Sequence, residues 1–99
     1  MSEYNLDLQY NDVTYGVEDV NFKEFESCTF TNCDFSLCNF IAVIFIDCNF
    51  NNCNFNNSKI NHVALRTVYF NNCKVKGVNF AMCDKLIFEI HFKITIDKD

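Results

Sequence analysis

Apolar residues recur at a fixed five-residue step through most of this chain. Each unit places a small residue two positions before a large apolar one, with mostly polar residues around them, as in Ser27-Cys28-Thr29-Phe30-Thr31. The large position is filled without a break from residue 25 to residue 80 by Phe25, Phe30, Phe35, Phe40, Phe45, Phe50, Phe55, Ile60, Leu65, Phe70, Val75 and Phe80. All seven cysteines occupy the small position: Cys28, Cys33, Cys38, Cys48, Cys53, Cys73 and Cys83.

A five-residue step fits neither a regular helix nor a plain strand. Apolar pairs repeated every five residues would spread around all sides of a 3.6-residue helical turn. In a strand, an odd period would turn each successive unit to the opposite face. A chain that turns a corner every five residues keeps both the small and the large residue inside. Four such sides close a twenty-residue coil, so twelve units predict an all-β solenoid of about three coils.

The pattern divides the chain into three parts. Residues 1–22 alternate only loosely and predict a cap of one or two short strands. Residues 23–84 carry the repeat. Residues 85–99 alternate strictly, with Phe88, Ile90, Phe92, Ile94 and Ile96 on one face, which predicts a strand over 86–96. That strand either caps the last coil or pairs with a second copy of the chain in a homodimer.

The repeat resembles the pentapeptide-repeat family, whose consensus places Ala, Cys or Ser two residues before a central Leu or Phe. This resemblance implies a right-handed quadrilateral β-helix. The Cys/Phe-rich units, followed by Cys83-Asp84-Lys85-Leu86-Ile87-Phe88, resemble the branch of quinolone-resistance and microcin-immunity proteins that act on DNA gyrase. In that branch more coils follow the interruption. Because the repeat does not resume after Phe92, the chain is expected to correspond to the N-terminal half of such a protein, as a fragment or a truncated product.

The formal charge of −5 is unevenly distributed. Residues 1–22 carry all of the net charge, and residues 23–84 balance five acids against five bases. No basic patch is present, so direct nucleic-acid binding is not expected. The chain has no run of 18 apolar residues and no secretion signal at its start, so we expect a cytoplasmic protein without a membrane span.

The cysteines could in principle be metal ligands, disulfide partners or buried apolar residues. Five-residue steps do not match zinc-ligand spacing. In-register neighbours such as Cys33 and Cys53 would have Cβ atoms about 4.8 Å apart, beyond usual disulfide geometry. Burial as small apolar residues fits best. His62 falls at an outward position, away from every cysteine, so a catalytic dyad is not expected. The sequence therefore predicts no enzyme activity, metal or cofactor.

The outward positions are mainly asparagine, with one apolar exception. Asn32, Asn52 and Asn72 form one predicted column, which suits corners because Asn tolerates left-handed backbone. The exception comprises four residues that we take as a candidate interaction surface: Leu37, Ile41, Ile44 and Ile46. Either the N-terminal segment covers them or a partner does.

Two functions follow from these observations. The first is a non-catalytic protein-interaction or scaffold module. The second rests on the resemblance, which implies a gyrase- or topoisomerase-binding protein that mimics duplex DNA and protects the enzyme from quinolones or toxins.

Overall fold

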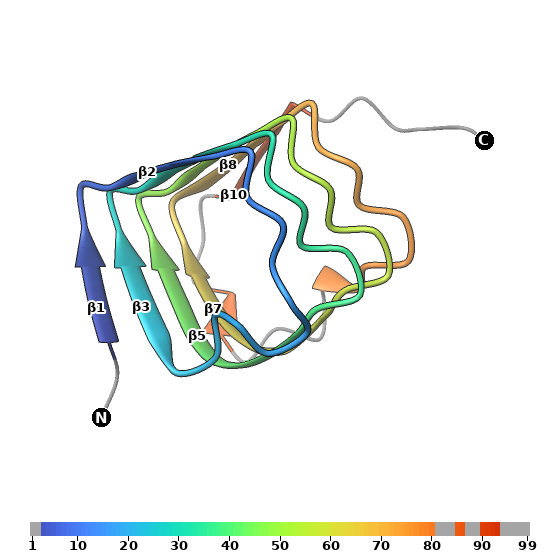
Figure 1. Ribbon diagram of the computed structural model, residues 1–99, viewed down its shortest axis with the longest axis horizontal. Helices are drawn as coiled ribbons and strands as arrows, with labels where there is room; N and C mark the ends of the chain where they lie inside the picture. The colour runs from blue at the N-terminus through green and yellow to red at the C-terminus, as the bar shows by residue number, and fades with distance from the viewer. Residues whose placement is uncertain (1–2, 81–84, 87–89, 94–99) are drawn as a thin grey trace.

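The fold is a stack of coils whose strands align into two parallel sheets (Figure 1). The computed structural model describes residues 3–80, 85–86 and 90–93. The first sheet has the order β1 (Glu3–Leu6), β3 (Lys23–Glu26), β5 (Asn39–Ile46), β7 (Lys59–Arg66) and β9 (Lys85–Leu86). The second has the order β10 (Ile90–Lys93), β8 (Val68–Asn71), β6 (Asn49–Asn51), β4 (Thr29–Thr31) and β2 (Gln9–Asn11).

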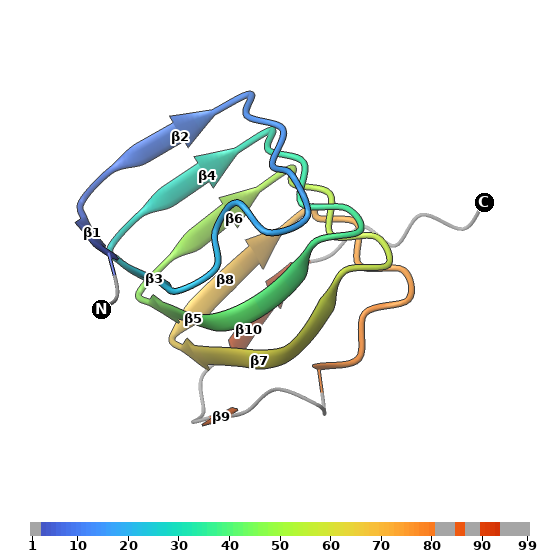
Figure 2. The same ribbon diagram turned by 60° about the horizontal axis from the view of Figure 1, so that its bottom comes forward.

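Successive coils stack in register at the predicted step of twenty residues. Phe25 pairs with Phe45 in the first sheet, and Phe30 pairs with Phe50 in the second. On a third side of the coils, isolated parallel β-bridges join Asp34 to Thr14 on the preceding coil and to Asn54 on the following one. Figure 2 shows the coils lying parallel to one another along the stack. The predicted β-solenoid is therefore confirmed.

The corners are made by left-handed backbone at five-residue intervals. Positive φ values recur at Ser27, Asn32, Leu37, Ala42, Asp47, Asn52 and Asn57, among other positions. The predicted asparagine column lies at one such corner, with φ of 55° at Asn32, Asn52 and Asn72. Asn and Asp tolerate this conformation better than other residues with a side chain, which explains how the chain turns so often with only two glycines.

Phenylalanine fills the centre of the solenoid. The rings of Phe30 and Phe50 stack between coils, with centroids 4.9 Å apart and planes 15° apart. Within a coil, Phe30 and Phe35 meet edge to face at 5.5 Å. Both arrangements are favourable for aromatic pairs. The predicted core residues that are buried comprise Phe25, Phe30, Phe35, Phe40, Phe45, Phe50, Phe55, Phe70, Cys28, Cys33, Cys38, Cys48, Cys53 and Cys73. Phe80 is half-buried against them, and Cys83 lies outside the described residues.

The N-terminal segment adds strands to the same stack. β1 pairs with β3 and β2 pairs with β4, both at the twenty-residue step. The ring of Tyr10 stacks on that of Phe30 at 4.7 Å, and Tyr15 stacks on Phe35 at 4.5 Å. Residues 3–22 therefore cap the solenoid by forming one more turn of it.

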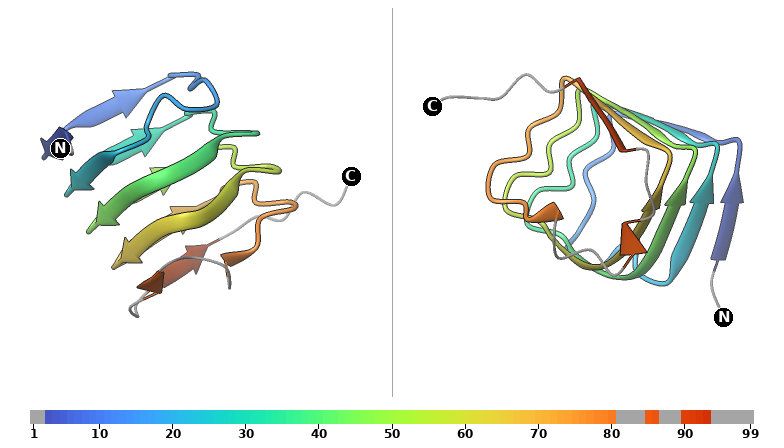
Figure 3. Two further views of the ribbon diagram at one scale, coloured as in Figure 1. Left: turned by 90° about the horizontal axis from the view of Figure 1, so that it is seen from below. Right: turned by 180° about the vertical axis from the view of Figure 1, so that it is seen from behind.

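The C-terminal segment differs from the single strand predicted over 86–96, which was wrong. Two short strands, β9 and β10, take its place, one in each sheet (Figure 3). Leu86 pairs with Leu65 and Phe92 pairs with Phe70, so the step lengthens from 20 residues to 21 and then 22. The sequence alternates strictly across both strands, so it predicted one strand where there are two. Alternation of apolar and polar residues shows which face of a sheet a residue occupies, but it does not show where one strand ends and the next begins. The remainder of the predicted strand lies outside the described residues.

Candidate interaction surface

The cysteines line the inner wall, and each described thiol lies next to backbone carbonyl oxygens. Cys48 donates from Sγ to the carbonyl of Phe25 at 3.4 Å, and Cys53 donates to that of Phe30 at 3.3 Å. Both acceptors lie 23 residues earlier, on the preceding coil. All six described cysteines are free and buried. At the small position of the repeat, cysteine therefore supplies both a small side chain and a weak hydrogen-bond donor. The apolar pattern alone did not reveal the role as a donor.

Burial makes Cys33, Cys38 and Cys48 poor nucleophiles. It raises the pKa of Cys48 to about 12 and that of Cys38 to about 11, and it also raises the pKa of Cys33. A reactive cysteine needs the opposite shift, since the thiolate is the nucleophile. The hydrogen bond with Cys53 lowers the pKa of Cys73, but this thiol is fully buried in the inner wall. His62 lies exposed on the outside of the solenoid, away from the inner wall that holds the thiols.

The interior offers little room for a substrate. A cavity of about 10 Å³ lies among core side chains that include Phe40, Ile60 and Leu65. Ligand sites usually exceed about 300 Å³. Within residues 3–80, 85–86 and 90–93, no group of three or more His, Cys, Asp or Glu side chains is arranged to hold a metal ion. No helix in the same ranges is long and apolar enough to cross a membrane.

The outer face of the second sheet is largely polar. Its strands align Thr31, Asn51 and Asn71 in one column. Asn71 donates from Nδ2 to Oδ1 of Asn51 at 2.8 Å, so neighbouring coils are also linked by side chains. This ladder is the structural role expected for stacked asparagines.

The outer face of the first sheet carries an apolar pair. Ile44 and Ile46 point outward from β5 and are half-buried, while Val43 and Phe45 between and beside them point into the core. We call Ile44 and Ile46 the β5 patch. On the β3 side their register partners are Glu24 and Glu26, and on the β7 side they are Ala64 and Arg66. The patch is thus flanked by carboxylates on one side and a guanidinium on the other.

The other two residues of the predicted surface lie elsewhere. Leu37, which is 64% exposed, occupies a corner with φ of 63°. A second corner, at Ala42, separates it from the β5 patch. Ile41 precedes that second corner and is half-buried, and its backbone N–H donates to Oδ1 of Asn21 at 2.9 Å. The structure therefore brings together two of the four predicted residues. The N-terminal segment stacks at the end of the sheet and does not lie over the patch.

Two exposed residues extend this face toward the N-terminus and were not predicted from the sequence. Tyr4 and Leu6 point outward from β1 and are 52% and 47% exposed. Tyr4 donates its hydroxyl to Oε1 of Glu26 at 2.6 Å, and this hydrogen bond is the main cause that raises the pKa of Tyr4 to about 12. The loose alternation of residues 1–22 did not show how Tyr4 and Leu6 pair with the strands that follow. Only the structure shows that they lie on the same face as the β5 patch.

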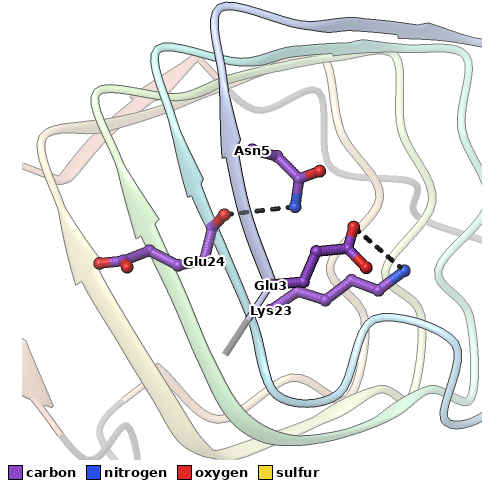
Figure 4. Close-up of polar contacts among 4 residues, drawn as sticks. All are labelled: Glu3, Asn5, Lys23 and Glu24. Atoms are coloured by element: carbon purple, nitrogen blue, oxygen red, sulfur yellow. Dashed lines mark hydrogen bonds and ion pairs between the residues drawn. The ribbon is translucent and has the colours of Figure 1, made fainter. Parts of the chain in front are cut away.

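Polar contacts replace the apolar repeat where this sheet ends (Figure 4). Asn5 occupies the large central position of the first coil and donates from Nδ2 to the carbonyl oxygen of Glu24 at 3.3 Å. Nζ of Lys23 lies 4.0 Å from Oε2 of Glu3 and forms an ion pair with it. Both carry exposed side-chain area, so this ion pair contributes little to stability.

Comparisons with known proteins agree with this geometry. A family described as pentapeptide repeat region matches residues 23–93. Full-length QnrB1, a plasmid-mediated fluoroquinolone resistance protein, aligns with a TM-score of 0.60 and 19% identity over 78% of this chain. Rfr23, a pentapeptide repeat protein from the cyanobacterium Cyanothece 51142, aligns with a TM-score of 0.55 and 14% identity over 96% of this chain and 88% of its own. No curated protein matches the chain in sequence.

The match to QnrB1 covers 48% of that chain, so this chain spans about half of its length. At these identities the two structures establish the fold. The family match covers the repeat and both C-terminal strands, and the solenoid has the predicted corners and columns. The chain therefore belongs to the pentapeptide-repeat proteins.

Proposed function

We propose that this protein is a non-catalytic protein-interaction module that binds its partner through the β5 patch. The observation that carries the proposal is the outward position of Ile44 and Ile46 on a strand whose neighbours present charged side chains. An apolar centre with a polar rim is the usual anatomy of a contact site. A core filled with phenylalanine further supports a surface function rather than a catalytic one.

The rim favours a partner of particular chemistry. Glu24 and Glu26 lie on one side of the patch, and Tyr4 extends the same face. A partner that places an apolar side chain against Ile44 and a basic one near these carboxylates would complement the surface. The fixed spacing of the coils presents these side chains with little entropic cost on binding.

A photo-crosslinking residue placed at position 44 tests this proposal. Position 49 on β6 is the matched control, since Asn49 is also outward and half-buried but lies on the polar face. We expect position 44 to crosslink a defined host protein and position 49 not to do so. Ile46→Lys should abolish the crosslink from position 44, and Asn49→Lys should leave it intact. Equal crosslinking from both positions would refute the patch as a specific contact site.

A second candidate function is binding of DNA gyrase or a related topoisomerase, with protection against quinolones or toxins. It is favoured by the similarity to QnrB1, which is itself a fluoroquinolone resistance protein, and by the Cys/Phe-rich form of the repeat. An acidic solenoid could occupy a site that binds duplex DNA. In this chain the net negative charge is concentrated in residues 1–22.

A supercoiling assay with gyrase and ciprofloxacin tests the second candidate. Protection of supercoiling at micromolar protein would support it, and Ile44→Lys would show whether the β5 patch makes the contact. The absence of protection, with a folded protein by circular dichroism, would remove gyrase from consideration. The crosslinking experiment would still decide on the more general interaction role.

A further inference from the structure

A fourth side closes each coil of the solenoid, and it carries apolar side chains that belong neither to the core nor to the β5 patch. Its first, second and third rows are residues 17–22, 37–42 and 57–62. Val17 and Phe22, in the first row, are 54% and 58% exposed, and Leu37, in the second row, is 64% exposed. Ile41, also in the second row, is half-buried. β5 begins in the second row and reaches the β5 patch only after the corner at Ala42, so the fourth side is a separate surface.

Two of these apolar side chains occupy backbone positions that do not suit them. The φ values of Phe22 and Leu37 are both 63°. They are the only large apolar residues with positive φ in the described part of the chain, where the other such positions hold Asn, Asp, Ser, Thr, Ala or Gly. A bulky side chain is disfavoured in left-handed backbone, and strain of this kind often marks a functional position. Because both side chains are mostly exposed, packing within the chain does not offset this cost, whereas a contact with a partner would.

Charge on the fourth side is distributed about the second row. The first row has two exposed acids, Glu18 and Asp19, and no base. The second row has no charged residue. The third row has an exposed base, Lys59, together with the exposed His62, and no acid. An uncharged strip that contains Leu37 therefore separates an acidic row from a basic one.

Backbone contacts hold the three rows side by side. The N–H of Phe22 donates to the carbonyl oxygen of Ile41 at 3.0 Å, and Ile41 is the register partner of His62 in the third row. Asn39 in the second row is likewise the register partner of Lys59. The acidic and basic rows thus lie on opposite sides of the second row, at similar distances from it.

This arrangement is complementary to itself. We propose that the protein forms a twofold dimer through its fourth side, with the axis running along the second row. Such an axis places the first row of each copy opposite the third row of the other, so Glu18 lies near Lys59 of the second copy and Phe22 lies near its His62. Leu37 lies near the axis, where it packs against the second row of the other copy. An axis along the solenoid would instead oppose two acidic rows, which is unfavourable.

The dimension of the fourth side sets the expected strength of the dimer. Three rows span about 14 Å along the stack, and one row spans about 17 Å. This footprint is smaller than that of a standard interface, which buries about 800 Å² on each partner, so we expect a reversible dimer with a Kd of about 10–100 μM. An isologous contact closes at two copies. The β5 patch remains outside the contact, so the dimer does not depend on the proposed function.

Sedimentation of the full chain between about 5 μM and about 1 mM tests the stoichiometry, over a range that spans the expected Kd. We expect the average mass to rise with concentration and to stop at that of a dimer. A monomer at all concentrations, or growth beyond a dimer, would overturn the proposal.

Leu37→Asn tests the apolar contact without weakening the fold. This change removes exposed apolar area and relieves the left-handed corner, so a loss of association cannot result from unfolding. We expect it to raise the Kd about tenfold. Leu6→Asn makes the same change at an exposed leucine of β1, away from the fourth side, and should leave the Kd unchanged. Equal effects of the two variants would place the contact elsewhere.

Charge reversal tests the direction of the rows. Glu18→Lys and Lys59→Glu should each raise the Kd about tenfold, because each chain then opposes like charges in its own dimer. In an equal mixture, each altered residue lies opposite the other altered residue and each native one opposite its native counterpart. The mixture should therefore associate as strongly as the unsubstituted chain. A mixture as weak as the separate variants would rule out this twofold arrangement, and so would single variants that associate as well as the unsubstituted chain.

Discussion

The thiol of Cys48 lies 3.4 Å from the carbonyl oxygen of Phe25, its hydrogen-bond acceptor on the preceding coil. Cys53 and Cys73 repeat this relationship with Phe30 and Phe50. The donor belongs to the small position of one unit and the acceptor to the large position of a unit one coil earlier. The small and large positions of the repeat are therefore linked by hydrogen bonds between coils as well as by their spacing along the chain.

Replacement of Cys48 tests this coupling. Cys48 is fully buried, so Cys48→Ala removes packing atoms and a hydrogen-bond donor together. We expect the free energy of unfolding to fall by about 1–2 kcal/mol. Urea denaturation measures the change. The adjacent outward substitution Asn49→Ala is the control and should change stability by less than about 0.5 kcal/mol. Equal effects would contradict a special role for the inner column.

The stability of the protein should fall at alkaline pH. An unfolded thiol ionises near pH 9.0, whereas the pKa of Cys38 is raised to about 11 and that of Cys48 to about 12. A raised pKa of an acidic group means that the folded state favours the neutral thiol. Its contribution is therefore complete below the unfolded pKa and is lost as pH rises from about 9 toward 12. Burial also raises the pKa of Tyr10 and Tyr15, which extends the loss above pH 10.0.

Urea titrations between neutral pH and about pH 11 measure this dependence. Cys48→Val, which keeps an apolar side chain of similar size, should make the decline less steep. An unchanged slope in that variant would show that other groups cause the alkaline loss.

Native cysteines should react slowly with thiol reagents. All six described cysteines are buried, and their reaction requires opening of the coil stack. At pH 8 we expect labelling of Cys28, Cys48 and Cys53 to be slower by about a hundredfold or more than in denaturant. Mass spectrometry of labelled peptides measures each site. Fast labelling of the inner column under native conditions would contradict the packing described.

The five-residue spacing was sufficient to predict the solenoid, because the core and corner positions recur with similar residues. The N-terminal turn escaped full recognition because its central positions hold Asn5, Tyr10, Tyr15 and Val20, which share spacing but not chemistry. An end coil is packed on one side only, so it tolerates this variety. At the other end the step lengthens to 22 residues, and a fixed period cannot anticipate such an insertion.

The placement of the four candidate surface residues was predicted only in part, for a similar reason. Outward positions can be read from the repeat, which identified Ile44 and Ile46. Whether two outward residues share a face depends on the corners between them, and those require the backbone. Leu37 is close to Ile44 and Ile46 in the sequence, but it lies at a corner and is therefore not beside them in space.

Ser58 occupies the small position between Cys38 and Val78, and its buried hydroxyl has no hydrogen-bond partner. An unsatisfied buried hydroxyl is costly. We therefore expect Ser58→Ala to leave stability unchanged or raise it by up to about 1 kcal/mol, and Ser58→Cys to raise it by about 1–2 kcal/mol because it restores the wall residue of Cys38. The half-buried Ser36 provides the control, since Ser36→Ala should have little effect. A clear loss with Ser58→Ala would mean that the hydroxyl is bonded.

Leu37 occupies a left-handed corner with φ of 63°, where the next two coils have Asn57 and Gly77. Leucine carries a steric penalty in this conformation that asparagine and glycine largely avoid. Leu37→Asn should therefore increase the free energy of unfolding by about 1 kcal/mol, and the reciprocal Asn57→Leu should decrease it by a similar amount. Leu6→Asn is the matched control, because Leu6 is also an exposed leucine but lies in the extended strand β1. If Leu6→Asn stabilised the protein as much as Leu37→Asn, the gain would come from removal of exposed apolar surface and not from relief of the corner.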